Sequence, residues 1–319
     1  MREIVIKNKY QEVTLLDVGA SLHKWLAYSD KRNIVITNKN VSDYFDKNDG
    51  YLSTTVGRVA NRIKDGKFNL NGTLYQLNTS FDGVNHCHGG PNGFFKKVFD
   101  VVEVSDAKVV FKYVSKDMEE GYPGALTLYV TYELNDNNMT ITYDATTDKD
   151  TIINITNHTY FNLSNENDIL NHHLKASVSG FLETDEGLVP TGKVIDVKNT
   201  VYDLNNECVL KDIVLLDELQ RKSLGLDHAF LFKKDKKEVV LSYQNHSLKI
   251  VTSYPGIQIY SGNNPIRQEL LNRKYVKHFG IAMEPQYEPN AINIPSFNSM
   301  ILKKNDNYHE TISYTLIEK

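Results

Sequence analysis

The chain has 319 residues, with 36 lysines and arginines against 40 aspartates and glutamates, and a formal net charge of −4 at pH 7. The pI near 6.2 and the scattered cations exclude the clustered basic surface that a nucleic-acid partner requires. Hydrophobic residues make up 40% and charged residues 24%, so the chain can bury a large core without disulfides or metal staples.

The N-terminal segment and the two cysteines bear on location. Residues 1–7 alternate like a strand and lack the apolar segment of a signal peptide. No apolar run approaches the ~18–20 residues that a membrane span needs. Cys87 and Cys208 lie far apart, which predicts free thiols in a reducing compartment. We therefore expect a cytoplasmic protein with no membrane partner.

Alternation of apolar and polar residues predicts β-strands along most of the chain. Asn71-Gly72 tolerates the positive φ angles of a type I′ turn, which predicts a hairpin between residues 67–70 and 73–77. A second hairpin is predicted between residues 126–134 and 139–143, on either side of a polar turn. Strand–turn–strand patterns recur further along the chain, at residues 98–114, 239–253 and 311–317.

Helical periodicity is scarce, and residues 210–220 are the best helix candidate. No βαβ alternation points to a parallel nucleotide-binding sheet, and no linker or repeat divides the chain. These features predict an all-β fold, a large antiparallel β-sandwich with few short helices. We expect residues 1–319 to form a single domain.

Polar motifs stand between the predicted strands at positions far apart in the sequence. They are GRVANRI (57–63), HCHGG (86–90), TNHTYFN (156–162), LDHAF (226–230), PGIQIY (255–260) and EPQYEPNAIN (284–293). In order and spacing this series resembles the motifs of the aldose 1-epimerase (galactose mutarotase) family. Family members are large antiparallel β-sandwiches with the site in a cleft, so the resemblance implies the fold that the strand pattern predicts independently.

The resemblance also implies a role for each matching residue. His158 matches the general acid, which protonates the ring oxygen of a pyranose, and Glu284 matches the general base, which deprotonates the anomeric hydroxyl. The residues that match the sugar-binding positions are Asn61, Arg62, His88, Asp227 and Gln258. The implied activity is interconversion of the α and β anomers of a free aldohexose such as galactose or glucose.

Ring opening of a hemiacetal needs a proton removed from O1 and another added to the ring oxygen. A carboxylate is ionised at neutral pH and can act as the base, and an imidazole near pKa ~6.5 can act as the acid if a negative charge supports it. Asp227 is our candidate for that charge. Closure runs the same two transfers backwards, so we expect no cofactor and no metal. The partner is a small monosaccharide, and a homodimer is compatible with these features.

Several residues admit a structural interpretation. His86 and His88 form an His-x-His pair that could hold a metal from one strand face, but the motif is short, and His86 is expected to be peripheral. The tandem His172-His173 is expected in an exposed loop. Trp25 is the only tryptophan and lies outside every motif, so we expect it in the core.

The chain departs from the family pattern at three positions. Cys87 stands where a larger apolar residue is usual, which should change packing more than chemistry. Glu288 stands near the place of a usual aromatic residue, and Asn290 near that of a usual aspartate. We expect the last two to alter the surroundings of the base.

Two other functions are compatible with the same sequence. Asp227 and Glu284 could be the paired carboxylates of a glycoside hydrolase, although that interpretation leaves His158 without a role. A non-catalytic sugar-binding or sensor protein could share the scaffold, because fold resemblance does not determine function. Retention of both His158 and Glu284 argues against the sensor.

Overall fold

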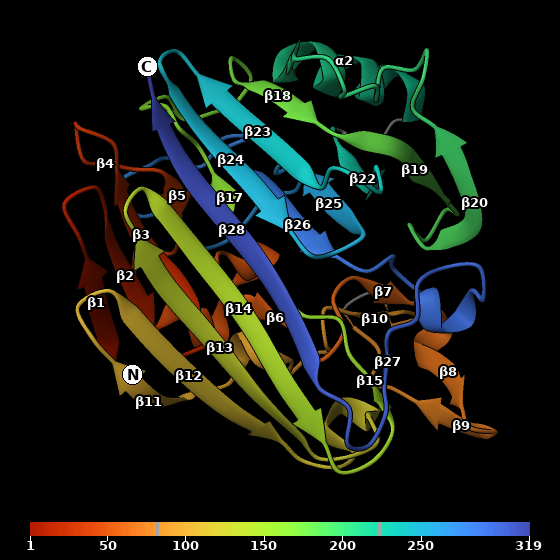
Figure 1. Cartoon of the computed structure of the whole chain (residues 1–319). Helices are drawn as coiled ribbons and strands as arrows, with labels where there is room; N and C mark the ends of the chain where they lie inside the picture. The colour runs from red at the N-terminus through yellow and green to blue at the C-terminus, as the bar shows by residue number, and fades with distance from the viewer. Residues whose placement is uncertain (81–82, 222–224) are drawn as a thin grey trace.

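The computed structural model describes residues 1–80, 83–221 and 225–319. Strands dominate these residues, and the α-helices within them are the short α1 (Asp43–Asp46) and α2 (Leu210–Arg221) (Figure 1). Single 3-10 turns are η1 (Asp49–Tyr51), η2 (Lys64–Gly66), η3 (Phe94–Lys96), η4 (Glu119–Gly121) and η5 (Ala291–Asn293). The predicted all-β class and the predicted helix at residues 210–220 are both confirmed.

A nine-stranded sheet forms one layer. Its order is β11-β12-β13-β14-β28-β24-β23-β18-β21, and every neighbouring pair is antiparallel. Figure 1 shows its long strands lying side by side across the front of the molecule. The strands are β11 (Asp100–Val104), β12 (Lys108–Ser115), β13 (Leu126–Asn135), β14 (Asn138–Thr147), β28 (Tyr308–Glu318), β24 (His246–Thr252), β23 (Glu238–Tyr243), β18 (His173–Ala176) and β21 (Cys208–Val209).

A seven-stranded antiparallel sheet forms the second layer, in the order β20-β19-β22-β25-β26-β17-β5. Its strands are β20 (Pro190–Asp196), β19 (Val178–Thr184), β22 (Asp227–Phe232), β25 (Gly256–Tyr260), β26 (Ile281–Gln286), β17 (Tyr160–Phe161) and β5 (Val35–Ile36). A four-stranded sheet adds β1 (Glu3–Lys7), β2 (Glu12–Leu16), β3 (Ser21–Ala27) and β4 (Arg32–Asn33).

The remaining strands form short pairs around these sheets. The pairs are β6 (Thr55–Val56) with β16 (Thr156–Asn157), β7 (Arg62–Ile63) with β10 (His86–Cys87), β8 (Lys67–Leu70) with β9 (Thr73–Gln76), and β15 (Thr151–Ile152) with β27 (Ile301–Leu302).

The main hydrophobic core joins the two large sheets. Val130 of β13 and Ile312 of β28 belong to the same buried cluster as Ile259 of β25 and Met283 of β26. Along β13 the buried residues recur at every second position, because successive side chains of a strand point to opposite faces. Removing such apolar surface from water is the main stabilising term, at roughly 25 cal/mol per Å².

Two local predictions are confirmed at the level of single residues. Asn71 and Gly72 have φ angles of 52° and 81°, as a type I′ turn requires, and they connect β8 to β9. Trp25 is fully buried, with its ring edge-on to those of Phe161 and Tyr314 at centroid distances of 6.4 and 5.8 Å.

Two predictions are wrong. Residues 311–317 do not turn, because they lie inside the single strand β28, whose alternation of burial runs unbroken between its partners β14 and β24. His172 is not an exposed loop residue: its side chain is buried, and Nε2 accepts a hydrogen bond of 2.9 Å from the Leu163 N–H. His173 begins β18 with its side chain 44% exposed. Among the described residues, no helix is long and apolar enough to cross a membrane.

Candidate active site

A pocket of about 690 Å³ brings together side chains from segments far apart in the sequence. All seven residues singled out from the sequence line it: Asn61, Arg62, His88, His158, Asp227, Gln258 and Glu284. Five of them are almost fully buried, and only Arg62 and Asp227 are partly exposed. The motifs therefore converge in space, although each comes from a different element.

One wall of the pocket is formed by adjacent strands of the seven-stranded sheet. Gln258 of β25 lies directly opposite Glu284 of β26, so the two side chains share a face of the sheet. Asp227 begins the next strand, β22, and its Oδ1 accepts a hydrogen bond of 2.5 Å from Gln258 Nε2. This bond fixes the orientation of the Gln258 amide, whose oxygen then faces away from Asp227.

The opposite wall is built by the short pair β7–β10. Asn61 has a φ of 60° and exchanges two hydrogen bonds with His88: its N–H donates to Nδ1 at 3.3 Å, and its carbonyl accepts the His88 N–H at 3.1 Å. Asn61 Nδ2 also donates to Gln258 Oε1 at 3.2 Å, which joins the two walls. Because His88 Nδ1 faces an N–H donor, the neutral ring carries its proton on Nε2.

The glycine after His88 is required by a close backbone approach. Gly89 has a φ of 85°, and a Cβ at this position would lie 1.7 Å from the carbonyl oxygen of Gly57. Only glycine fits there, which explains why HGG and GRVANRI act as one structural unit. Arg58 of GRVANRI has a structural role. It is buried, and its guanidinium donates to the carbonyls of Pro123 and Gly124, both at 2.9 Å.

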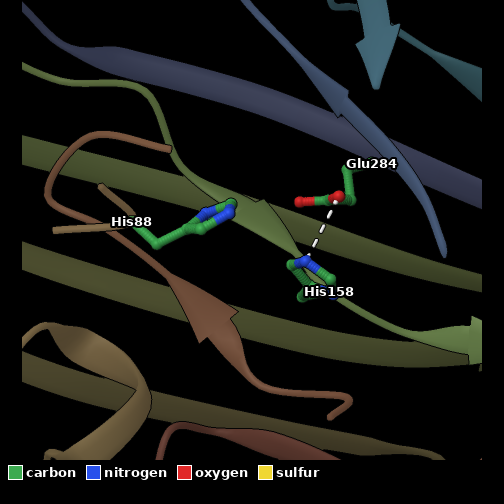
Figure 2. Close-up of side chains that lie close together, drawn as sticks. All are labelled: His88, His158 and Glu284. Atoms are coloured by element: carbon green, nitrogen blue, oxygen red, sulfur yellow. Dashed lines mark ion pairs between the residues drawn. The ribbon is translucent and has the colours of Figure 1, made fainter. Parts of the chain in front are cut away.

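His158 and Glu284 both line the pocket and form a close pair (Figure 2). Nε2 of His158 lies 3.4 Å from Oε1 of Glu284, and both side chains are buried. Within the described chain, His158 Nδ1 and Glu284 Oε2 have no hydrogen-bond partner. A buried carboxylate oxygen without a donor is costly, so it is the place where a hydroxyl of a bound molecule would be stabilised.

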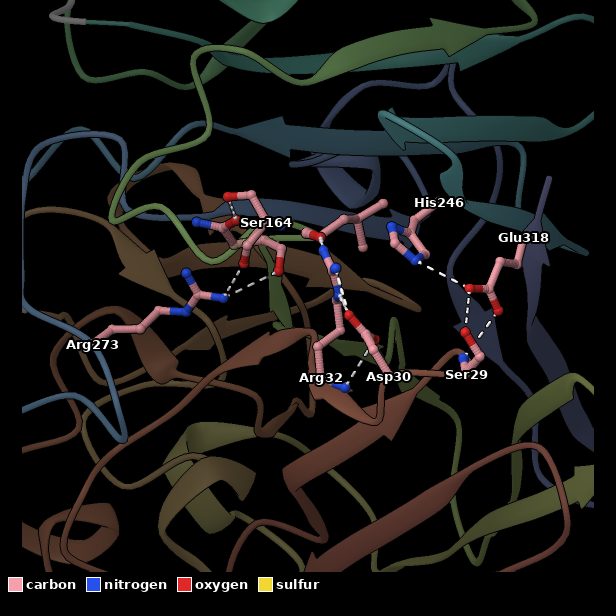
Figure 3. Close-up of polar contacts among 9 residues, drawn as sticks. Ser29, Asp30, Arg32, Ser164, His246, Arg273 and Glu318 are labelled. Atoms are coloured by element: carbon pink, nitrogen blue, oxygen red, sulfur yellow. Dashed lines mark hydrogen bonds and ion pairs between the residues drawn. The ribbon is translucent and has the colours of Figure 1, made fainter.

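The loop that follows β17 is held by two arginines. Arg32 Nη1 donates to the Leu163 carbonyl at 2.7 Å. Arg273 Nη2 donates to the Ser164 carbonyl at 2.6 Å (Figure 3). Its Nη1 donates to the carbonyl of Glu166. Since β17 begins two residues after His158, these bonds fix the chain just beyond the imidazole.

Burial controls the protonation of the pair. It lowers the pKa of His158 to about 4 and raises the pKa of Glu284 well above its ordinary value. The charge of Asp227 raises the pKa of Glu284 further, while Arg62 opposes the rise. Burial also lowers the pKa of His88, with additional contributions from His158 and Arg62. The low-dielectric site therefore favours the uncharged form of each partner.

The carboxyl group in direct contact with His158 is that of Glu284. Support of a protonated His158 by the charge of Asp227 stays a prediction. The Glu284 carboxylate is 3.4 Å from the imidazole, whereas Asp227 binds Gln258 and acts on the pKa of Glu284. An acid and a base at adjacent positions can donate one proton to a bound molecule and remove another without storing net charge.

Three of these residues could in principle hold a metal ion. The donor atoms of His88, His158 and Glu284 all lie within 4.8 Å of one another. The tautomer of His88 does not fit this use, because its pocket-facing Nε2 carries the proton when Nδ1 accepts the Asn61 N–H. His86 is committed elsewhere, since its nitrogens lie 2.6 Å from the Asn78 carbonyl and 2.5 Å from the Tyr122 hydroxyl. The His-x-His interpretation is therefore not supported.

Aromatic side chains complete the pocket and were not assigned a role from the sequence. They are Tyr51, Phe95, Tyr160, Tyr260 and Phe279. Tyr160 and Tyr260 lie inside the polar motifs, where an aromatic residue between site residues was a usable signal. The other three lie outside every motif, and only the fold brings them to the site.

The departures from the family pattern have unequal weight. Within the described chain, Glu288 and Asn290 do not line the pocket: Glu288 accepts from Asn298 at 2.7 Å, and Asn290 Oδ1 accepts the Lys64 N–H at 3.2 Å. Their side chains therefore bond outside the pocket, and an effect on the surroundings of the base stays a prediction. Cys87 is buried and does line the pocket.

The fold and site together define a class: a β-sandwich protein with a buried histidine–glutamate pair in a polar pocket. Residues 2–315 match a family model described as aldose 1-epimerase. The galactose mutarotase of Sus scrofa is 36% identical over 289 residues, covering 88% of this chain and 82% of its own. The aldose 1-epimerase of Escherichia coli K12 is 34% identical over 322 residues, covering 96% and 92%.

Solved structures agree with this assignment. The crystal structure of a galactose 1-epimerase from Lactobacillus acidophilus has a TM-score of 0.88 at 29% identity, covering 99% of this chain and 94% of its own. An aldose epimerase homologue from C. elegans has a TM-score of 0.90 at 28% identity, covering 99% of both chains. The chain belongs to the aldose 1-epimerase family, whose members are isomerases acting on carbohydrates.

Proposed function

We propose that the protein is a mutarotase that interconverts the α and β anomers of free aldohexoses, with galactose and glucose as substrates. The observation that carries the proposal is the buried His158–Glu284 pair, 3.4 Å apart in a pocket with polar walls. The names of the pig and Escherichia coli relatives, galactose mutarotase and aldose 1-epimerase, support the same reaction.

The reaction begins with a proton on His158 and a negative charge on Glu284. Glu284 removes the proton from O1 while His158 protonates the ring oxygen, and the C1–ring oxygen bond breaks to leave an open-chain aldehyde. O1 and the ring oxygen are attached to the same carbon, so acid and base must be neighbours, as the 3.4 Å spacing provides. Rotation about C1–C2 presents the other carbonyl face, and closure returns both protons.

The pair carries one proton at each stage of the reaction. In the closed-ring state it is on His158, and in the open-chain state it is on Glu284, so the total charge never changes. Burial favours the form with both groups uncharged, which is the form that accompanies the aldehyde. The site thereby stabilises the high-energy open-chain state relative to the closed sugar.

The remaining polar residues are proposed to hold the sugar hydroxyls. His88 presents an Nε2–H donor, Arg62 presents a cation, and the hydrogen-bonded series Asn61–Gln258–Asp227 presents a fixed polar wall. Their mutual hydrogen bonds orient the side chains before the sugar arrives, which reduces the ordering cost of binding.

Neither alternative function is favoured. A glycoside hydrolase built on Asp227 and Glu284 leaves unexplained why His158 lies directly against Glu284. A sensor would not need an acid and a base in contact. Three further expectations stay predictions: one domain over residues 1–319, a cytoplasmic location and a homodimer. The family model spans residues 2–315, which supports one domain, and the free thiols of Cys87 and Cys208 suit a reducing compartment.

Polarimetry on freshly dissolved α-galactose and α-glucose tests the function. We expect decay to the equilibrium rotation well above the buffer rate, and no change with methyl α-galactoside, whose anomeric oxygen carries no proton. Release of nitrophenol from an aryl galactoside would instead support the hydrolase. Binding of galactose with decay at the buffer rate would support the sensor.

A further inference from the structure

Tyr51 lies against both histidines of the pocket. Its ring centroid is 4.6 Å from that of His88 and 5.7 Å from that of His158. The ring also meets Phe95 edge-on at 4.8 Å. Tyr51 also lines the pocket.

The backbone of Tyr51 is held in an unfavourable conformation. Its φ is 56°, in the left-handed region that bulky residues rarely adopt, and it forms the last residue of η1. Such a conformation persists only where the surroundings impose it, and it is common at functional sites. Asp49, the first residue of η1, accepts hydrogen bonds from a distant segment.

Residues 267–268 form hydrogen bonds to η1 and restrain it. We call this set of hydrogen bonds the latch. Arg267 donates to Asp49 through Nη2 and Nε, both at 2.7 Å, and through its backbone N–H at 3.0 Å. Gln268 Nε2 donates to the Asp49 carbonyl at 2.7 Å. Four hydrogen bonds on one residue fix the turn that ends at Tyr51.

The same turn is hydrogen-bonded to the backbone of His158. The Tyr51 carbonyl accepts the Thr54 N–H at 3.2 Å and the Thr54 Oγ1 at 2.9 Å. Thr54 in turn accepts the His158 N–H at 2.9 Å, and the Ser53 N–H donates to the His158 carbonyl at 3.0 Å. Tyr51 is thus joined to His158 both through its ring and through the chain.

The Tyr51 hydroxyl plays a smaller part in these contacts. Burial keeps the pKa of Tyr51 well above its ordinary value, so the phenol stays protonated. The ring, not the hydroxyl, makes the contacts with the imidazoles.

We propose that Tyr51 is a positioning residue for the reaction: its ring, held by the Asp49–Arg267 latch, fixes the His158 imidazole against Glu284 and keeps water from it. This inference rests on the proposed function, because the imidazole that it positions is the proposed acid. In this proposal the latch controls the position of the His158 imidazole, a role that none of the sugar-binding residues fills.

The experiment compares Tyr51→Leu, Tyr51→Phe and the matched control Tyr75→Leu, which removes a ring stacked on Phe68 at 5.2 Å outside the pocket. We expect Tyr51→Leu to lower kcat by about 10–100-fold with KM changed far less, since a misplaced acid slows the chemical step. Tyr51→Phe should keep kcat within about threefold, because it retains the ring. Arg267→Gln, which breaks the latch, should lower kcat by about two- to fivefold.

A second readout does not depend on activity. Histidine NMR titration of the free protein should show the pKa of His158 closer to its ordinary value in Tyr51→Leu than in wild type or Tyr51→Phe, because water reaches the ring. The inference would be overturned if Tyr51→Leu left the pKa of His158 unchanged, or if it altered KM alone. The wild-type enzyme would be active in either case, so the proposed function would stand. An inactive wild type would instead count against the proposed function, and the NMR comparison would still test the contact.

Discussion

His158 and Glu284 illustrate how burial can make two ordinary side chains into a proton-transfer pair. Each group alone in water would ionise near its ordinary pKa, but in the pocket the pKa of His158 falls to about 4 and that of Glu284 rises. The two shifts oppose charge on either side chain. The pair therefore favours the arrangement in which both groups are uncharged. A bound sugar, with a donor at O1 and an acceptor at the ring oxygen, is what makes the charged arrangement accessible.

Buried histidines should make the protein sensitive to acid. Burial lowers the pKa of His86 and His158 to about 4 and that of His172 to about 3, against ~6.5 in the unfolded chain. Below pH 6.5 the unfolded chain therefore binds protons that the native protein does not. The free energy of unfolding should fall as the pH drops from about 6.5 to about 4, by up to ~1.4 kcal/mol per pH unit for each histidine.

Urea unfolding between pH 4 and 7 checks this dependence. His172→Gln, whose amide oxygen can still accept the Leu163 N–H, should give a shallower decline than wild type. Equal slopes for wild type and His172→Gln would contradict the assignment.

Gly89 and Gly72 allow a matched test of the site's backbone. Both have positive φ, at 85° and 81°, but a Cβ on Gly89 would strike the Gly57 carbonyl, while nothing lies within 4 Å of one on Gly72. Gly72→Ala should cost only the backbone penalty, ~1 kcal/mol. Gly89→Ala should cost several times more and abolish activity, because His88 and Gly57 must move apart. Thermal unfolding of the two variants measures the difference, and equal costs would rule out the close approach.

At the scale of elements, the strands were predictable wherever alternation was unbroken. The hairpins β8–β9 and β13–β14 follow from local pattern, and Asn71-Gly72 even predicts the turn type. The pairing of β14 with β28 was not predictable, because it joins residues more than 160 positions apart and leaves no local signal. The same limit explains the error at residues 311–317, where a long strand was divided by a turn that does not exist.

The loop after β17 shows how an element outside the pocket supports it. Arg273 is partly buried, and it donates to the carbonyls of Ser164 and Glu166. Arg273→Lys cannot reach both acceptors, so we expect a loss of ~1–3 kcal/mol in the free energy of unfolding. The exposed pair Lys39–Glu269 is the control, because Lys39→Ala should change the free energy of unfolding far less than Arg273→Lys. Similar losses from the two variants would show that the loop does not depend on Arg273.

At the scale of the whole molecule, two stacked sheets bring six distant motifs to one pocket. The resemblance of the polar motifs to the aldose 1-epimerase family was sufficient to select His158, Glu284 and their five polar neighbours, which all line the pocket. It was not sufficient to assign the aromatic wall. Tyr51 and Phe279 resemble core residues in sequence, and only the packing of the sheets places them in the pocket.

Activity is also expected to be independent of metal. The tautomer of His88 leaves the cluster of His88, His158 and Glu284 short of one ligand. Exhaustive treatment with a chelator should therefore leave the rate of mutarotation unchanged. A rate that falls on chelation and returns with added zinc would contradict this prediction and would assign the cluster to a metal.

The central claim is that His158 and Glu284 together carry the proton transfers, and polarimetry of α-galactose with wild type, His158→Asn, Glu284→Gln and the control His309→Asn tests it most directly. Each site variant should lose about 10²–10⁴-fold in kcat, because each lacks one proton transfer. His309→Asn, which alters an exposed histidine paired with Asp144, should match wild type. Either site variant retaining more than about a tenth of the wild-type rate would contradict the account, because loss of a positioned proton transfer costs far more than tenfold.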